Sequence, residues 1–200
     1  VILSSPQVRI LDQGSFSSVS AGRGSAGNVT IDASESIVSS GTIAATTFVA
    51  GQGGTVRINT PRLVVREGGR VAASTFGTGD AGRVEIDAAE FVEVSGTLPG
   101  GTEATRINSN AQLAPPVFQR LGAPPTPSGD AGGVTINTPF LRVSDRGQVT
   151  VENAGSGNAG ELQLNANTIV LDTEGKITAA TRSGAGGDIV LNVQDSLQLH

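Results

Sequence analysis

The chain has 200 residues, a formal net charge of -5 and 28 glycines, and it contains no cysteine. The missing cysteines exclude disulfides, thiolate metal ligands and cysteine nucleophiles. Charges are spread along the chain without a basic cluster, and no apolar run approaches the roughly 18 residues of a membrane span, so the sequence predicts neither nucleic-acid binding nor membrane insertion.

A nine-residue pattern returns six times along the chain, as a glycine turn, an alternating strand and a final Asp or Asn. Its clearest instance is GDAGRVEID, from Gly79 to Asp87. The fourth position of the pattern is a glycine in every copy: Gly27, Gly54, Gly82, Gly132, Gly160 and Gly187. These turn glycines are spaced 27, 28, 50, 28 and 27 residues apart, so one interval holds about 22 extra residues. Such a period predicts a solenoid, with residues 1–200 forming a single repeat domain.

The ends of the chain do not coincide with whole repeats. Residues 1–22 match the second half of a repeat, and the C-terminal LNVQDSLQLH stops after a second strand. We therefore expect a fragment of a longer protein. Open strands at the two ends, 8–11 and 189–193, would favour end-to-end self-association.

Each repeat predicts three short strands. In the first, apolar residues alternate with polar ones, as Val84 and Ile86 do around Glu85, which is typical of a half-buried strand. A second strand such as EFVEVS leads to a glycine turn, and a third such as TIAATT follows. These strands can bury their apolar faces only by pairing in parallel with the next repeat, and parallel crossovers are right-handed. The fold prediction is an all-β, right-handed parallel β-helix with about 27–28 residues per turn and no significant helix.

A polar residue stands five positions after each turn glycine. It is always Asp or Asn: Asp32, Asn59, Asp87, Asn137, Asn165 and Asn192. Because these residue types bond nearby backbone groups and tolerate the left-handed conformation of corners, we expect a structural ladder at a corner of the coil. A row of ion ligands is the alternative. A second row, on the third strand, consists of Thr47, Thr75, Asn153 and Thr181.

The extra residues form an insertion at about 98–128. Its first part, 98–103, enlarges a corner, and TRINSN from Thr105 resembles a displaced third strand. The second part, 112–128, is proline-rich and carries the candidate contact loop: Val117, Phe118, Arg120 and Leu121. Insertions in solenoids lie on one face and often bind partners. The alternative is that the apolar side chains of this loop pack back onto the rod.

Two glycine motifs imitate ligand sites. GTGDAG, at 77–82, matches a dinucleotide fingerprint, but a strand pattern follows it where the fingerprint requires a helix. The same stretch resembles calcium-binding repeats, yet the position of Asp80 holds other residue types in most copies, which removes a regular carboxylate cage. We therefore predict no cofactor and no metal.

Carboxylates are the remaining candidates for catalysis, because many parallel β-helices act on polysaccharides. The densest group surrounds Glu85, which should pair with Arg57 one coil below, and this leaves little for acid and base chemistry. Tyr and Trp are absent. The sequence predicts a protein without catalytic residues.

The repeat G-x-(A/G)-G-x-V-x-I-(D/N), with ASTFGTGDAGRVEIDA as its clearest instance, resembles the repeat region of filamentous haemagglutinin-like exoproteins of two-partner secretion systems. The resemblance covers essentially the whole chain. It implies export through an outer-membrane transporter to the bacterial surface or medium, and adhesion to a glycan or cell-surface ligand. The expected function is a structural or adhesive rod. Alternatives are a carbohydrate-active β-helix and, from the row of Thr47, Thr75 and Thr181, an ice-binding surface.

Overall fold

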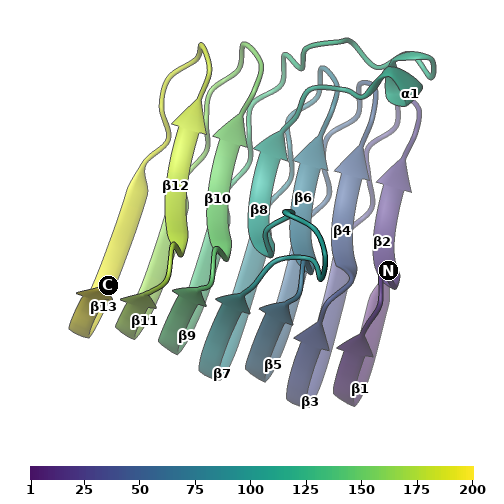
Figure 1. Cartoon of the computed structure of the whole chain (residues 1–200). Helices are drawn as coiled ribbons and strands as arrows, with labels where there is room; N and C mark the ends of the chain where they lie inside the picture. The colour runs from purple at the N-terminus through teal and green to yellow at the C-terminus, as the bar shows by residue number, and fades with distance from the viewer.

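The computed structural model describes residues 1–200, whose strands coil around one long axis (Figure 1). Sheet A holds seven long strands in this spatial order: β1 (Ile2–Ile10), β3 (Val29–Ser39), β5 (Val56–Arg66), β7 (Val84–Ser95), β9 (Val134–Ser144), β11 (Leu162–Leu171) and β13 (Ile189–Leu199). Sheet B holds six shorter strands in this order: β2 (Ser15–Ser20), β4 (Thr42–Thr47), β6 (Arg70–Thr75), β8 (Arg106–Ala111), β10 (Gln148–Asn153) and β12 (Lys176–Thr181).

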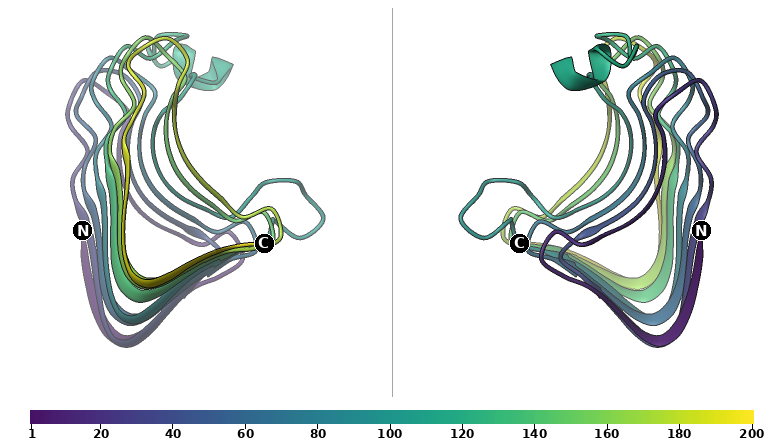
Figure 2. Two further views of the ribbon diagram at one scale, coloured as in Figure 1. Left: turned by 90° about the vertical axis from the view of Figure 1, so that its left-hand side faces the viewer. Right: turned by 90° about the vertical axis from the view of Figure 1, so that its right-hand side faces the viewer.

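Every strand pairs in parallel with its equivalent one coil away, as β5 does with β3 and β7. The left view of Figure 2 looks along the axis from the C-terminal end, and there the chain turns counterclockwise as it approaches the viewer. The coil is therefore right-handed. The predicted right-handed parallel β-helix is confirmed.

The first two predicted strands of each repeat are joined into one bent strand. The pairing of β3 with β5 changes register between Asp32 and Ile37, and the pairing of β7 with β9 does so between Asp87 and Phe91. These irregularities coincide with the bend that gives sheet A its V-shaped outline in Figure 2. A bulge bends a strand without ending its ladder. The sequence pattern shows only that the alternation is interrupted.

The core lies between the two sheets and consists of stacked like residues. Ten apolar residues of the first strand segments have no exposed surface: Val29, Ile31, Val56, Ile58, Val84, Ile86, Val134, Ile136, Leu162 and Leu164. Ile189 and Leu191 of β13, at one end of sheet A, are 44% and 36% exposed. Each fully buried Val, Ile or Leu contributes about 1.5–3 kcal/mol, so the stacked array provides the main driving force for folding.

Five of the six turn glycines, all except Gly27, are required by close contact with the backbone of the preceding coil. A Cβ atom on Gly82 would lie 1.9 Å from the carbonyl oxygen of Gly54, and one on Gly132 would lie 1.7 Å from that of Gly82. None of the six has a left-handed φ, whereas the opposite corner uses pairs of left-handed residues such as Asp145 and Arg146. We expected glycine at these positions because of a turn conformation. The structure shows instead that a side chain here would collide with the neighbouring coil.

The insertion leaves the stack intact. β8, the predicted displaced third strand, pairs with β6 and β10 in continuous register. Before it, residues 97–104 form a loop closed by an antiparallel bridge between Thr97 and Ala104. After it comes α1 (Pro116–Gln119), a single helical turn whose first position is a proline, a residue suited to helix starts.

Candidate binding site

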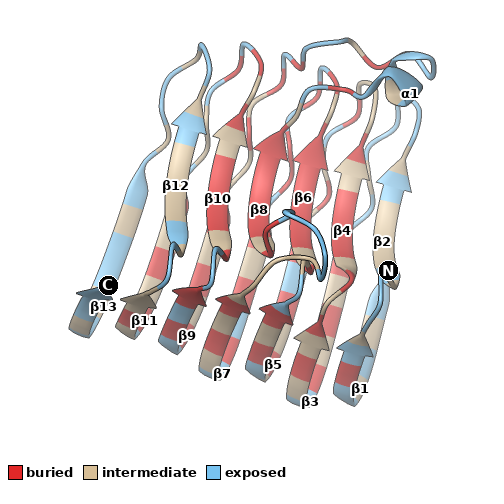
Figure 3. Ribbon diagram, viewed as in Figure 1, coloured by how far each residue is buried: buried red, intermediate tan, exposed pale blue.

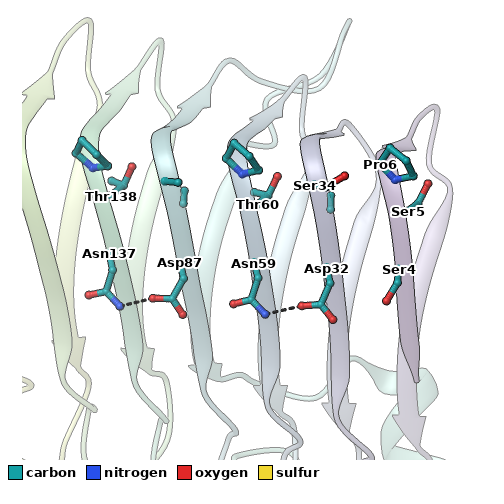
Figure 4. A pocket seen from close by; sticks show the side chains of 15 residues that line it. Ser4, Ser5, Pro6, Asp32, Ser34, Asn59, Thr60, Asp87, Asn137 and Thr138 are labelled. Atoms are coloured by element: carbon teal, nitrogen blue, oxygen red, sulfur yellow. Dashed lines mark hydrogen bonds between the residues drawn. The ribbon is translucent and has the colours of Figure 1, made fainter.

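The ladder residues form a row along the outside of sheet A (Figure 4). Each amide donates to the residue one coil back in four steps: Asn59 to Asp32 (2.5 Å), Asn137 to Asp87 (2.7 Å), Asn165 to Asn137 (2.6 Å) and Asn192 to Asn165 (2.7 Å). No hydrogen bond joins Asn59 to Asp87. The two carboxylates alternate with amides, so that no two negative charges are neighbours in the row.

The ladder differs in two respects from the expectation. Its members lie within the long strands, before the bend, and none has a left-handed φ. They bond to each other's side chains, whereas we expected bonds to corner backbone groups. Parallel in-register stacking brings identical positions one strand spacing apart, about 4.8 Å, which an Asn side chain can span by side-chain hydrogen bonding.

The ladder borders an open groove at the bend of sheet A, which also carries a row of proline rings from Pro6, Pro61 and Pro139. Figure 4 shows the amides and carboxylates turned toward one another along this groove. No group of three or more His, Cys, Asp or Glu side chains is placed so that it could hold a metal ion. The polar groups of the groove are largely used within the ladder, which supports the structural interpretation over the row of ion ligands.

Charges on the outer face of sheet A are paired between coils. The predicted pair of Arg57 and Glu85 is present, with Arg57 Nε 3.0 Å from Glu85 Oε2. Hydrogen bonding and attraction to Glu85 raise the pKa of Arg57. Arg142 pairs in the same way with Asp172, at 3.1 Å. In the group around Glu85, Glu85 and Glu90 form ion pairs with Arg57 and Arg62, whereas Asp87 belongs to the ladder.

The outer face of sheet B has a different shape. Figure 2 shows that its strands curve toward the core, so that this face is concave, and that α1 and the 97–104 loop project on the same side at its two margins. Figure 3 shows the central strands buried along most of their length. Successive side chains of a strand point to opposite faces, so the side chains of the outer face are largely buried too. Ala72 and Asn108, on this outer face, are 3% and 0% exposed. We call this concave face, between α1 and the 97–104 loop, the trough.

Three phenylalanines form one wall of the trough. Phe118 of α1 stacks on Phe48 with ring centroids 4.1 Å apart and meets Phe76 edge-on at 5.1 Å. Both partners follow strands of sheet B, β4 and β6. The three rings line a cavity of about 330 Å³ whose floor includes Ala44 and Ala72. Phe118 therefore packs back onto the rod, as the alternative interpretation of the contact loop proposed.

The remaining residues of the predicted contact loop point away from the trough floor. Val117 and Leu121 are 58% and 56% exposed, and Arg120 is also exposed. None of the three lines the cavity. The structure thus separates the predicted loop into one docked ring and three solvent-facing side chains.

Arginines form the opposite wall of the trough. Arg70 begins β6 and Arg106 begins β8, and the two residues are direct neighbours in the sheet. The Nε atom of each is buried without a hydrogen-bond partner, as is Oδ1 of Asn108. Neither arginine takes part in the five ion pairs of the chain. Burial lowers the pKa of Arg70, and the charge of Arg106 lowers it further.

No Asp or Glu lines the cavity of the trough. A glycosidase-type mechanism needs two carboxylates on either side of the scissile bond. Arg70, together with serine and threonine hydroxyls and phenylalanine rings, can bind a polar ligand but supplies neither of those carboxylates.

Sequence reasoning missed Phe48, Phe76 and the two arginines. A signal existed for the phenylalanines, because ATTF and ASTF place them at the same repeat position, 28 residues apart. A signal for the arginines lay in the displaced third strand, because aligning RINSNA with RVAAST places Arg106 at the position of Arg70. β8 pairs with β6 in this register.

Two other predicted features have structural roles. Thr47 and Thr75 point inward, are fully buried and bond to each other at 3.2 Å, so this row cannot serve as an ice-binding surface. The fingerprint-like GTGDAG leads into β7, a strand, and lacks the helix N-terminus that holds a pyrophosphate.

Comparison of the chain with family models, with curated proteins and with solved structures finds no match. The resemblance to haemagglutinin-like repeats therefore stays a prediction. None of the helical segments has the length and apolar character needed to cross a membrane.

Proposed function

We propose that this chain is a non-catalytic β-helical rod that presents the trough as a contact surface for a glycan. The observation that carries the proposal is that both parts of the insertion flank the same concave face. The regular repeats form the stack, and the only large departure from the repeat forms the margins of one face. Insertions arranged in this way are common sites of binding in solenoids.

The composition of the trough supports a glycan over an apolar ligand. Aromatic rings offer a broad apolar surface at low entropic cost, and the small hydroxyl residues around Ser74 and Thr46 offer hydrogen bonds. The trough continues across several coils, which suits an extended chain better than a compact molecule. In keeping with the repeat style, we propose that the rod belongs to a secreted or surface-displayed bacterial exoprotein exported through an outer-membrane transporter.

The test compares two neighbouring residues of α1. Phe118→Ala removes the ring that stacks on Phe48, whereas Val117→Ala removes a side chain that is 58% exposed and lies outside the cavity. We expect Phe118→Ala to weaken glycan binding on a polysaccharide array and to lower stability by about 1–2 kcal/mol. Val117→Ala should change neither.

A wider replacement extends the test to the whole loop. Exchanging residues 113–126 for a Gly/Ser linker keeps the backbone bonds of Gln112, Pro127 and Ser128 to neighbouring coils. The β-sheet circular dichroism should persist while binding is lost. Full glycan binding by this replacement and by Phe118→Ala would contradict the proposed function.

A further inference from the structure

The arginine wall of the trough is locally basic on an acidic protein. The chain has a net charge of -5, yet the outward positions of sheet B carry Arg70, Arg106 and Lys176 in one row against a single carboxylate, Glu152. Parallel register makes this row continuous across β6, β8, β10 and β12, with Gln148 between Arg106 and Lys176. Such a row attracts an anion locally against the overall charge of the protein.

The two arginines are held without their usual partners. Five of the twelve arginines have a carboxylate within 4.0 Å. Of the seven that have none, only Arg70 and Arg106 have a buried Nε without a hydrogen-bond partner. Their only acidic neighbour in the adjoining hollow is Glu103 of the 97–104 loop. Two like charges side by side with buried, unbonded Nε atoms are unfavourable in the free protein. An anion bound against the two guanidinium groups would offset the repulsion between their charges.

We propose that the trough binds a carboxylate-bearing polysaccharide, a polyuronate, that lies along the strands, with sugar carboxylates on Arg70 and Arg106 at one wall and a sugar ring against Phe48, Phe76 and Phe118 at the other. This inference rests on the proposed function and names its ligand class. A guanidinium group binds a carboxylate through two parallel hydrogen bonds, which an ammonium group cannot reproduce. Arg70 and Phe76 stand at the two ends of β6, about 20 Å apart, a distance that several sugar units of one chain can span.

The floor between the two walls fits the rest of the sugar. Asn108 is fully buried on the outer face of β8, and its Oδ1 has no partner, while its Nδ2 lies 3.5 Å from Ser74 Oγ. Gln112 Nε2 also reaches Ser74 Oγ, at 3.4 Å. Gln112 is partly exposed and lines the cavity, so it can exchange its long contact with Ser74 for a sugar hydroxyl.

The experiment titrates the full chain with three polymers that differ in charge: polygalacturonate, its methyl-esterified form and dextran sulfate. We expect polygalacturonate to bind, and the ester to bind on the order of tenfold more weakly because it lacks the carboxylates. The variant Arg70→Gln/Arg106→Gln should lose a similar factor for polygalacturonate. Arg57→Gln, on sheet A, is the matched control and should bind as the wild type does.

Three outcomes would overturn the inference. These are equal affinity for polygalacturonate and its ester, unchanged affinity in the double arginine variant with an intact β-sheet spectrum, or tighter binding of dextran sulfate, which would indicate a general anion patch. If the neutral ester binds in a manner that needs Phe118 but not the arginines, the proposed glycan-binding function stands and the polyuronate inference fails. Absence of binding to any polymer array contradicts both.

Discussion

The outer faces of sheet A and sheet B are built on the same parallel register but use their polar residues differently. On sheet A, Arg57 lies against Glu85 of the next coil and the ladder amides bond to one another. On sheet B, Arg70 lies against Arg106, and buried polar atoms are left unbonded. The pKa of Arg57 is raised by its partner, while that of Arg70 is lowered by burial and by a like charge. Stacked repeats can satisfy their own polar groups, so the face that does not is the better candidate for binding.

The largest expected effect concerns the stack that both faces share. Gly132→Ala would place a Cβ 1.7 Å from the backbone carbonyl of Gly82, and Gly186→Ala is the matched control because it has open space around it. We expect the first to lower the free energy of unfolding by about 3 kcal/mol or more through overpacking, and the second to have little effect. Denaturant unfolding followed by circular dichroism measures both. Equal stability of the two variants would show that the coils can separate at this corner at little cost.

The ladder should give the next largest effect. Asn137 bonds to Asp87 and accepts from Asn165, whereas Asn192 makes only one such bond. Asn137→Ala is therefore expected to cost about 1–2 kcal/mol, and Asn192→Ala about half as much. Thermal melting of the two variants distinguishes this from a ladder that contributes only packing, for which the two losses would be the same.

Removing an arginine from the outer face of sheet B should raise stability, in contrast to the two preceding predictions. Arg106→Gln removes one of two adjacent positive charges and one buried unbonded Nε, so we expect stability to rise by about 1 kcal/mol. Arg57→Gln breaks a satisfied surface pair and should lower stability slightly. This contrast would indicate that the trough is maintained at some expense of stability, which is frequent at functional sites. Loss of stability in both variants would mean that Arg106 has a structural role.

The sequence was sufficient for the repeat, the core and the Arg57–Glu85 pair, because the period of the repeat determines which positions stack on one another. It was sufficient for the handedness because parallel crossovers are right-handed. It was not sufficient for the joining of two strand segments at the bend, since a bulge leaves no residue type of its own. The trough was missed for a related reason. Phe118 lies 42 residues after Phe76 in the chain, and only the folded insertion brings the two rings to 5.1 Å.

The smallest expected effect lies at the one open step of the ladder. Asn59 uses its Nδ2 to bond Asp32, and Figure 4 shows its oxygen turned toward Asp87, whose carboxylate can only accept. In Asp87→Asn, the new amide could donate to Asn59 while still accepting from Asn137. We expect a gain of about 0.5 kcal/mol. Asp87→Ala removes the same charge but also the acceptor of Asn137, so it should be destabilising. Both variants remove the charge of Asp87, so the difference between their melting temperatures measures the contribution of the ladder hydrogen bonds alone. A lower stability of Asp87→Asn than of Asp87→Ala would contradict a ladder held by side-chain hydrogen bonds.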